Sequence, residues 1–136
     1  SDELFSSFDT WKNPSGKAQP EKFYHGFVLG LMVELRGLYY ISSNKESGFG
    51  RYDILMEQKE KGADAFIIEF KVVHTKQGET LESAVQAALK QIEEKKYDTV
   101  LRNRGIRPEK IRKYGFAFSG KVVSIGESTG TCSRFS

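Results

Sequence analysis

The sequence predicts an α/β domain in which a mixed β-sheet is flanked by helices, in the order αβββαββ. Three observations support this fold class. Apolar residues recur at helical spacing over residues 21–35 and from residue 81 to about residue 97. Five short segments rich in β-branched and aromatic residues have the composition of strands. The second helix separates the third strand from the fourth, which permits a parallel crossover, whereas short polar breaks elsewhere permit hairpins.

The size and composition of the chain limit the classes of protein to which it can belong. A chain of 136 residues is expected to form one domain that buries roughly two thirds of its unfolded surface. Its longest apolar stretch is too short to cross a bilayer, so no membrane partner is expected. The single cysteine, Cys132, excludes an intramolecular disulfide framework and a multi-cysteine metal site. A reducing, cytoplasmic location fits these features best.

Composition along the chain predicts one folded unit between two less regular ends. Residues 1–20 lack an initiator methionine and have only weak apolar spacing, so we expect an arm or the remnant of a preceding domain. Residues 21–125 would form the folded domain. Residues 126–136 are rich in Ser, Thr and Gly without an apolar period, and we expect a tail that is flexible or derived from cloning.

The first helix is expected over residues 21–35, after Pro20 and before Gly37. Its apolar stripe consists of residues four positions apart, namely Phe23, Phe27, Leu31 and Leu35. Glu34 lies beside this stripe, at the end nearest the following strand. It is either a third carboxylate of a functional site or an edge glutamate that reaches water.

The first three strands are expected at residues 38–42, 49–56 and 65–73. A short polar turn containing Gly62 separates the second strand from the third, which predicts a hairpin. Two further strands are expected at residues 113–119 and 121–125, again as a hairpin.

Two opposite charges, Glu69 and Lys71, interrupt the apolar third strand. Because strand side chains alternate, both charges point to one face of the sheet. Removing such charges from water costs several kcal/mol unless they are paired or bound to a metal. They form either a salt bridge at the rim of the sheet or a metal-binding carboxylate beside a lysine that acts on the same substrate. Asp53 favours the second interpretation, since the hairpin can place it beside Glu69.

The second helix and the segment after it carry the other candidate polar residues. Gln91 lies near the apolar stripe of this helix, where an amide caps the helix, is solvated, or orients a phosphate or water. Residues 95–113 contain eight basic side chains against two acidic ones. This segment is either a surface that contacts phosphates or a solvated basic helix and loop.

Asp53, followed sixteen residues later by Glu69-Phe70-Lys71, resembles the PD-(D/E)XK nuclease superfamily. Its restriction-endonuclease-like core carries an acid on one strand and acid-x-Lys on the next. Longer stretches at residues 24–31, 43–53, 67–71, 88–92 and 114–118, together with Tyr97, are similar to the nuclease domain at the carboxyl-terminal end of bacterial AAA-ATPase-like proteins. The resemblance extends from about residue 21 to residue 123.

The resemblance implies a metal-dependent site with the roles that such nucleases use. Asp53 and Glu69 would hold Mg²⁺ or Mn²⁺, with the Phe70 backbone carbonyl as a further ligand. Lys71 would orient or activate the attacking water. Glu34 would complete the acidic site, either behind the ligands or by supporting a second ion.

The resemblance also implies positions that line the site and contact substrate. Gln91 would occupy the helix position that lines the site in several branches of the superfamily. Lys45 and Arg51 would meet phosphates or remain surface residues. From the basic segment, Arg102 and Arg104 are the candidate contacts to nucleic acid.

The function expected from these features is a nuclease that hydrolyses phosphodiester bonds, of DNA in particular, by metal-activated water. The alternative is a noncatalytic nucleic-acid-binding or regulatory module attached to an ATPase, and a third hypothesis is a purely structural interaction domain. An ATPase-like region is expected to precede the domain in the natural protein. The sequence contains no base-reading motif, and it leaves the oligomeric state open, a homodimer included.

Overall fold

The computed structural model describes residues 19–45, 51–130 and 132–136. The described helices are α2 (Gln19–Leu35), α3 (Leu81–Lys95) and α4 (Tyr97–Asn103), with short 3₁₀ turns η2 (Thr75–Gln77) and η3 (Pro108–Lys110). The described strands are β1 (Tyr39–Lys45), β2 (Arg51–Gln58), β3 (Ala65–Val72), β4 (Ile111–Ser119), β5 (Val122–Glu127) and β6 (Cys132–Phe135).

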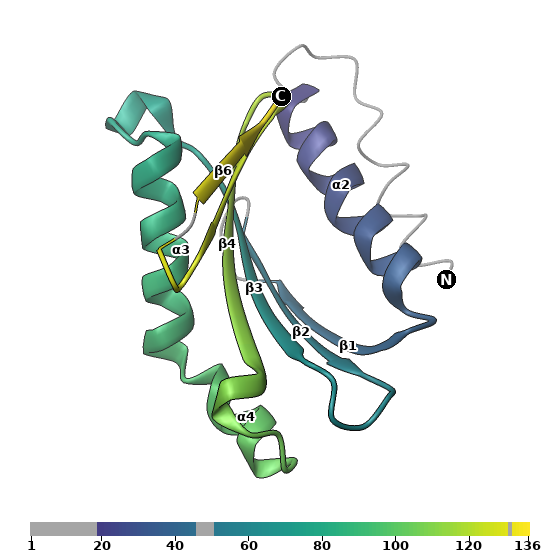
Figure 1. Ribbon diagram of the computed structural model, residues 1–136. Coiled ribbons are helices and arrows are strands. Elements are labelled where there is room, and N and C mark those ends of the chain that lie inside the picture. Colours follow the sequence, from purple (N-terminus) through teal and green to yellow (C-terminus); the bar gives the residue numbers. More distant parts are fainter. Residues whose placement is uncertain (1–18, 46–50, 131) are drawn as a thin grey trace.

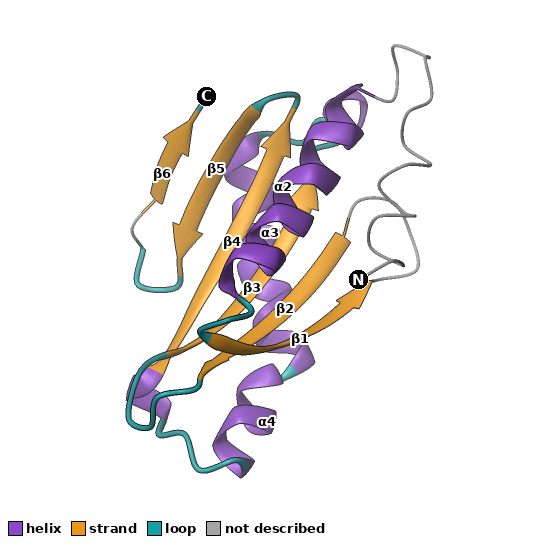
Figure 2. Ribbon diagram, turned by 90° about the vertical axis from the view of Figure 1, so that its right-hand side faces the viewer, coloured by secondary structure: helices purple, strands orange, loops and turns teal. Residues whose placement is uncertain are grey.

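These strands form one mixed sheet in the order β1-β2-β3-β4-β5-β6 (Figure 2). β3 and β4 run parallel, and every other neighbouring pair is antiparallel. A parallel pair needs a crossover of a dozen or more residues, and α3 and α4 form that crossover. The predicted hairpins and the predicted parallel crossover are thus confirmed.

The helices cover the two faces of the sheet (Figure 1). α2 lies on one face, and α3 lies on the other. Alternation along the strands divides the core accordingly. Ile54, Ile68 and Phe70 pack in the cluster that contains α2 residues, whereas Leu55 and Ile67 pack with residues of α3 and α4. The face on which a strand residue lies therefore decides which helix it can reach.

The α2 face is an aromatic core. Tyr24, Phe70 and Phe118 are at most 1% exposed, and ring pairs between them and their neighbours are separated by centroid distances of 5.0–6.4 Å. Offset and edge-to-face pairs at such distances add about 0.5–1.5 kcal/mol each beyond simple burial. His25 belongs to this core, since it is buried and its Nδ1 lies 3.1 Å from the Tyr52 hydroxyl. These contacts give His25 a place in the packing of this face.

The other face is distinguished by the close packing of α3 on β4 at Gly115. A Cβ atom built on this glycine would lie 2.8 Å from the Val85 carbonyl oxygen and 3.0 Å from the Ala88 Cβ. Only a residue without a side chain permits this approach. Since Gly115 pairs with Glu69 across β3 and β4, the close contact brings α3 over the strand that carries the predicted site.

The start and end of α3 are well defined by local interactions. Thr80 and Ser83 form a reciprocal capping box at its N-terminus, which satisfies two otherwise unpaired amides. At the other end Lys96 adopts a left-handed conformation (φ 54°), so the chain turns before α4 begins. This break between α3 and α4 places Lys95 and Tyr97 on either side of a sharp change in direction.

The fold class expected from the sequence is confirmed, with two differences. The basic segment after residue 97 contains the short helix α4, which buries Leu101. The expectation of a tail over residues 126–136 is wrong in part. β5 runs to Glu127, and β6 (Cys132–Phe135) pairs with β5 as a sixth strand. Residues 1–18, expected to form an arm, lie outside the described residues. No described helix is long and apolar enough to span a membrane.

Candidate active site

A pair of buried carboxylates lies at the centre of the α3 face. Asp53 on β2 and Glu69 on β3 are direct partners in the antiparallel register, and their exposed fractions are 1% and 0%. Directly opposite residues of two strands share a face. The pairing that the sequence predicts for these two residues is therefore present.

Two residues that follow the buried stripe of α3 hold this carboxylate pair. The Lys95 Nζ lies 2.7 Å from Asp53 Oδ2 and 3.4 Å from Glu69 Oε1. The Tyr97 hydroxyl donates a hydrogen bond to the same Asp53 Oδ2 at 2.6 Å. The ammonium compensates the buried charge, which would otherwise cost several kcal/mol.

Sequence reasoning missed Lys95 and used Tyr97 only as a point of resemblance. One signal for Lys95 was present: it lies three residues after Ile92, at the end of the stripe formed by Ala84, Ala88 and Ile92, all buried. A lysine that continues a buried helical stripe needs a charge partner.

The environment of Asp53 favours its ionised form. Burial alone raises the pKa of this carboxyl, but hydrogen bonds involving Glu69, Lys95 and Tyr97, together with the charge of Lys95, outweigh burial and lower that pKa. Burial and the bond to Asp53 raise the pKa of Tyr97, which remains a hydrogen-bond donor. One atom has no such partner: Asp53 Oδ1 is buried and accepts no hydrogen bond in the described part of the chain.

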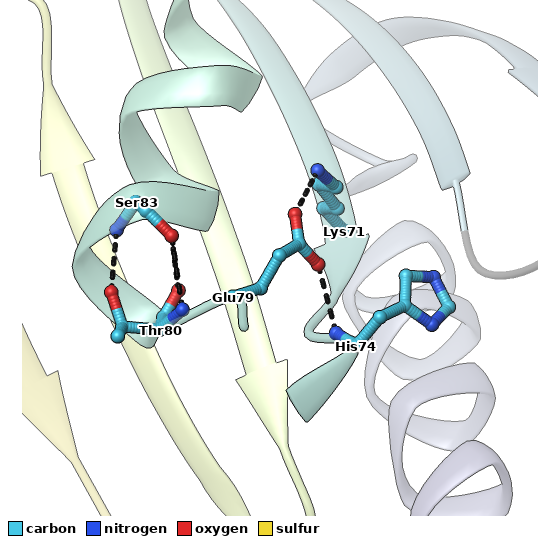
Figure 3. A network of polar contacts seen from close by, with 5 residues as sticks. All are labelled: Lys71, His74, Glu79, Thr80 and Ser83. Atoms are coloured by element: carbon cyan, nitrogen blue, oxygen red, sulfur yellow. Dashed lines mark hydrogen bonds and ion pairs between the residues drawn. The ribbon is translucent and has the colours of Figure 1, made fainter. Parts of the chain in front are cut away.

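Lys71 is held by a glutamate from outside the motif (Figure 3). Its Nζ lies 2.6 Å from Glu79 Oε2, and the other oxygen, Oε1, accepts the backbone amide of His74 at 2.8 Å. Burial alone raises the pKa of Glu79, but these two bonds and the Lys71 charge lower it overall. Sequence reasoning missed Glu79, although it directly precedes the Thr80 cap of α3.

The salt bridge between Glu69 and Lys71 that the sequence allowed is replaced by two separate pairs. Glu69 is bridged to Lys95, and Lys71 is bridged to Glu79. The two motif residues are thus oriented by different segments, one from each end of α3.

The structure does not bring all predicted residues to the carboxylate pair. Glu34 is exposed on α2, the helix that covers the opposite face (Figure 1). The Phe70 carbonyl accepts a hydrogen bond from Tyr24 of α2 at 3.4 Å, so it has a partner on that opposite side. Gln91 lies half-buried one helical turn before Lys95 on α3, the helix over the site.

The predicted phosphate contacts have two different outcomes. The side chains of Lys45 and Arg51 lie outside what the structure describes, although their backbones are in β1 and β2. Arg102 and Arg104 are exposed. The Nη1 atom of Arg102 lies 4.0 Å from Asp98 Oδ2, and the Nη1 atom of Arg104 lies 3.3 Å from Glu57 Oε2. Exposed ion pairs are worth about 0–1 kcal/mol, so these pairings do not prevent contact with phosphates.

The residues present fit a hard divalent cation held by few protein ligands. Two carboxylates lie side by side, and the buried Asp53 Oδ1 lacks a donor. Within the described ranges, no group of three or more His, Cys, Asp or Glu side chains is placed to hold a metal. Mg²⁺ is commonly bound through one or two carboxylates, with water and substrate phosphates as its other ligands. The donor set is consistent with that mode.

Comparison with known families and proteins gives one match. The family model described as the PD-(D/E)XK nuclease superfamily matches residues 19–128. This range includes Asp53, Glu69 and Lys71 as well as Lys95 and Tyr97, and it ends before β6. Searches of curated proteins and of solved structures give no match.

Proposed function

This chain belongs to the PD-(D/E)XK nuclease superfamily, and from that premise we propose that it is a metal-dependent nuclease that hydrolyses phosphodiester bonds of DNA. The observation that carries the proposal is the buried pair of Asp53 and Glu69 on adjacent strands. Two fully buried carboxylates side by side are unfavourable for stability alone, which is consistent with a role in binding a cation. Membership in a nuclease superfamily supports the reaction class.

Each residue of the site has a proposed role. Asp53 and Glu69 would hold Mg²⁺ or Mn²⁺ through carboxylate oxygens. When bound, the ion would polarise the scissile phosphate and lower the pKa of a water ligand. Tyr97 fixes Asp53 by its hydrogen bond to Oδ2, which leaves Oδ1 for the ion.

Lys71 would provide positive charge near the developing negative charge of the phosphate. It extends from β3 two residues after Glu69, on the same face of the sheet. The pairing with Glu79 orients its ammonium, and Lys71 would orient the attacking water from there.

DNA as the substrate is proposed from the basic character of residues 95–113. Exposed arginines such as Arg102 and Arg104 would contact phosphates without reading bases. An ATPase-like region before this domain remains a prediction that follows from the sequence resemblance, and the oligomeric state stays open, a homodimer included.

The test combines metal binding with cleavage. Mg²⁺ and Mn²⁺ would be titrated by calorimetry into wild type and into Asp53→Asn, Glu69→Gln and Lys71→Met, with Glu60→Gln in the exposed turn as a control. The same samples would be incubated with single-stranded DNA, double-stranded DNA and RNA. We expect wild type and the control to bind metal and cleave DNA. The two carboxylate variants should lose both properties, and Lys71→Met should bind metal but lose at least 100-fold in cleavage rate.

Several results would contradict the proposal. Full cleavage by Asp53→Asn or Lys71→Met would overturn the assignment of the site, and circular dichroism would confirm that any variant that loses cleavage is still folded. Cleavage of RNA alone would overturn the choice of DNA. Salt-sensitive DNA binding without any metal binding would instead support the noncatalytic module.

A further inference from the structure

We propose that Lys95 is an internal counter-ion for the site, and that a divalent metal ion must displace its ammonium group in order to bind. The inference rests on the proposed function, because it concerns how that function's metal ion gains access to Asp53 and Glu69. We call the contact of Lys95 with these two carboxylates the lysine bridge.

The geometry of the lysine bridge is that of a cation shared by two carboxylates. The Lys95 Nζ contacts an oxygen of Asp53 at 2.7 Å and an oxygen of Glu69 at 3.4 Å. These are the same two side chains that would hold the metal, and both are buried. The site is therefore already neutralised, in part, by the protein itself.

Charge opposes simultaneous occupation of the carboxylate pair by both cations. A metal ion bound to Asp53 Oδ1 would lie within a few ångströms of an ammonium on Oδ2 of the same carboxylate. At that separation and in a buried setting the repulsion between a divalent ion and an ammonium is strong. This repulsion is avoided if the Lys95 ammonium moves away from the two carboxylates when the metal ion binds.

The position of Lys95 allows it to leave. It is the last residue of α3, and 21% of its side chain is exposed, so its four-carbon stem can carry the ammonium to solvent. Its Nζ also lies 5.8 Å from the centre of the Tyr97 ring. Tyr97 keeps its hydrogen bond to Asp53 Oδ2 when Lys95 moves, so the carboxylate remains oriented.

A displaced counter-ion has two measurable consequences. It stabilises the metal-free protein, because it compensates two buried charges. The Lys95 ammonium also weakens metal binding, because only molecules whose carboxylates are free of it can bind the ion. The apparent affinity falls in proportion to that fraction of molecules. Removal of the ammonium should therefore lower the stability of the metal-free protein and raise metal affinity, a combination that loss of a purely structural contact would not produce.

The first experiment is calorimetric titration of Mn²⁺ and Mg²⁺ into the full chain as wild type, Lys95→Met and Lys90→Met. Methionine keeps the unbranched, apolar stem of the lysine side chain without its charged end, and Lys90 is exposed on the same helix. We expect Lys95→Met to bind at least tenfold more tightly than wild type and to melt at a lower temperature without metal. Lys90→Met should match wild type in both measurements.

The second experiment uses only wild type, so it does not depend on the folding of a variant. Lysines are reductively methylated with and without saturating Mg²⁺, and each site is quantified by peptide mass spectrometry. We expect methylation of Lys95 to increase severalfold when metal is bound, with no change at Lys90.

The results separate the lysine bridge from the proposed function. If wild type binds metal while Lys95 stays equally protected, or if Lys95→Met binds no more tightly, displacement is wrong and the nuclease proposal stands. If neither wild type nor Lys95→Met binds metal, both proposals fail. Binding detected in Lys95→Met alone would support a bridge that closes the site in the isolated chain.

Discussion

At the scale of single residues, Glu79 links Lys71 of the Glu69-Phe70-Lys71 motif to the start of the long helix α3. Its carboxylate contacts the Lys71 ammonium and the His74 amide, and these contacts lower its pKa overall although burial opposes them. A carboxyl whose pKa is lower in the folded protein than in the unfolded chain stabilises the fold when it is ionised.

The pH dependence of stability follows from this shift. The contribution of Glu79 is fully present above the ordinary glutamate pKa of about 4.3, and it is lost as the pH falls through the lower pKa of the folded state. We expect Glu79→Gln to be about 1 kcal/mol less stable than wild type at pH 7. Between pH 5 and pH 3 the free energy of unfolding should fall less in this variant than in wild type, because the variant has no carboxylate to protonate at this position. Urea denaturation at several pH values measures this, with Glu60→Gln as the control. Parallel acid profiles for wild type and Glu79→Gln would contradict the role of Glu79.

Strand alternation explains which residues of the site could be predicted. The proximity of Asp53 and Glu69 follows from two short strands and one turn, because the register of a hairpin fixes opposite residues. The contact of Lys95 with both carboxylates depends on the placement of α3 over the sheet, which involves residues far apart in the chain. Glu34 was a weaker prediction for the same reason: helical spacing gives its angle around α2, but not the face of the sheet that α2 covers.

At the scale of elements, Gly115 controls the distance between α3 and the sheet. An added methyl group would meet the backbone of Val85 and the side chain of Ala88, and neither can rotate away. We expect Gly115→Ala to destabilise the protein by about 1–3 kcal/mol. It should also weaken metal binding, because α3 leads into Tyr97, whose hydrogen bond orients Asp53.

A matched substitution on the other helix provides the control for this prediction. Gly30 lies in the interior of α2 with open space at its Cβ position. Since glycine is unfavourable inside a helix, Gly30→Ala should stabilise the protein by about 0.5–1 kcal/mol. Thermal and urea denaturation of both variants would test the pair. Equal effects of the two substitutions would show that α3 does not pack as closely as the structure indicates.

Elements with strong periodicity were predicted, whereas those that depend on tertiary contacts were not. α2, α3 and β1–β5 all lie within a few residues of their expected positions. α4 was missed because only Leu101 of this short helix is buried, so it has no apolar stripe to signal it. β6 was missed because a four-residue edge strand has no apolar period, and it is ordered by pairing with β5.

At the scale of the whole molecule, the two faces of the sheet have different tasks. The α2 face contains a continuous aromatic core and none of the residues that hold the carboxylate pair. The α3 face contains that pair within smaller apolar clusters. We therefore expect stability to depend mainly on the first face, while the second tolerates the cost of buried charge.

The sixth strand lies outside this division, and its removal tests how far the functional unit extends. Among the described strands β6 pairs with β5 alone, and Phe135 is 54% exposed. Its Arg134 forms an ion pair with Glu82 of α3, but both side chains are exposed, so the pair adds little. β6 also lies beyond residue 128, where the family match ends.

A chain that ends at Gly130 should therefore keep the fold and the site. Cross-strand pairs contribute about 0.2–1 kcal/mol each, and four register pairs join β6 to β5, so we expect a loss of about 1–2 kcal/mol in urea denaturation. Metal affinity and cleavage rate should stay within twofold of the full chain, because Asp53 and Glu69 lie on strands at the other side of β4. Loss of metal binding in a truncated chain that still unfolds cooperatively would show that the edge strand acts on the site through α3.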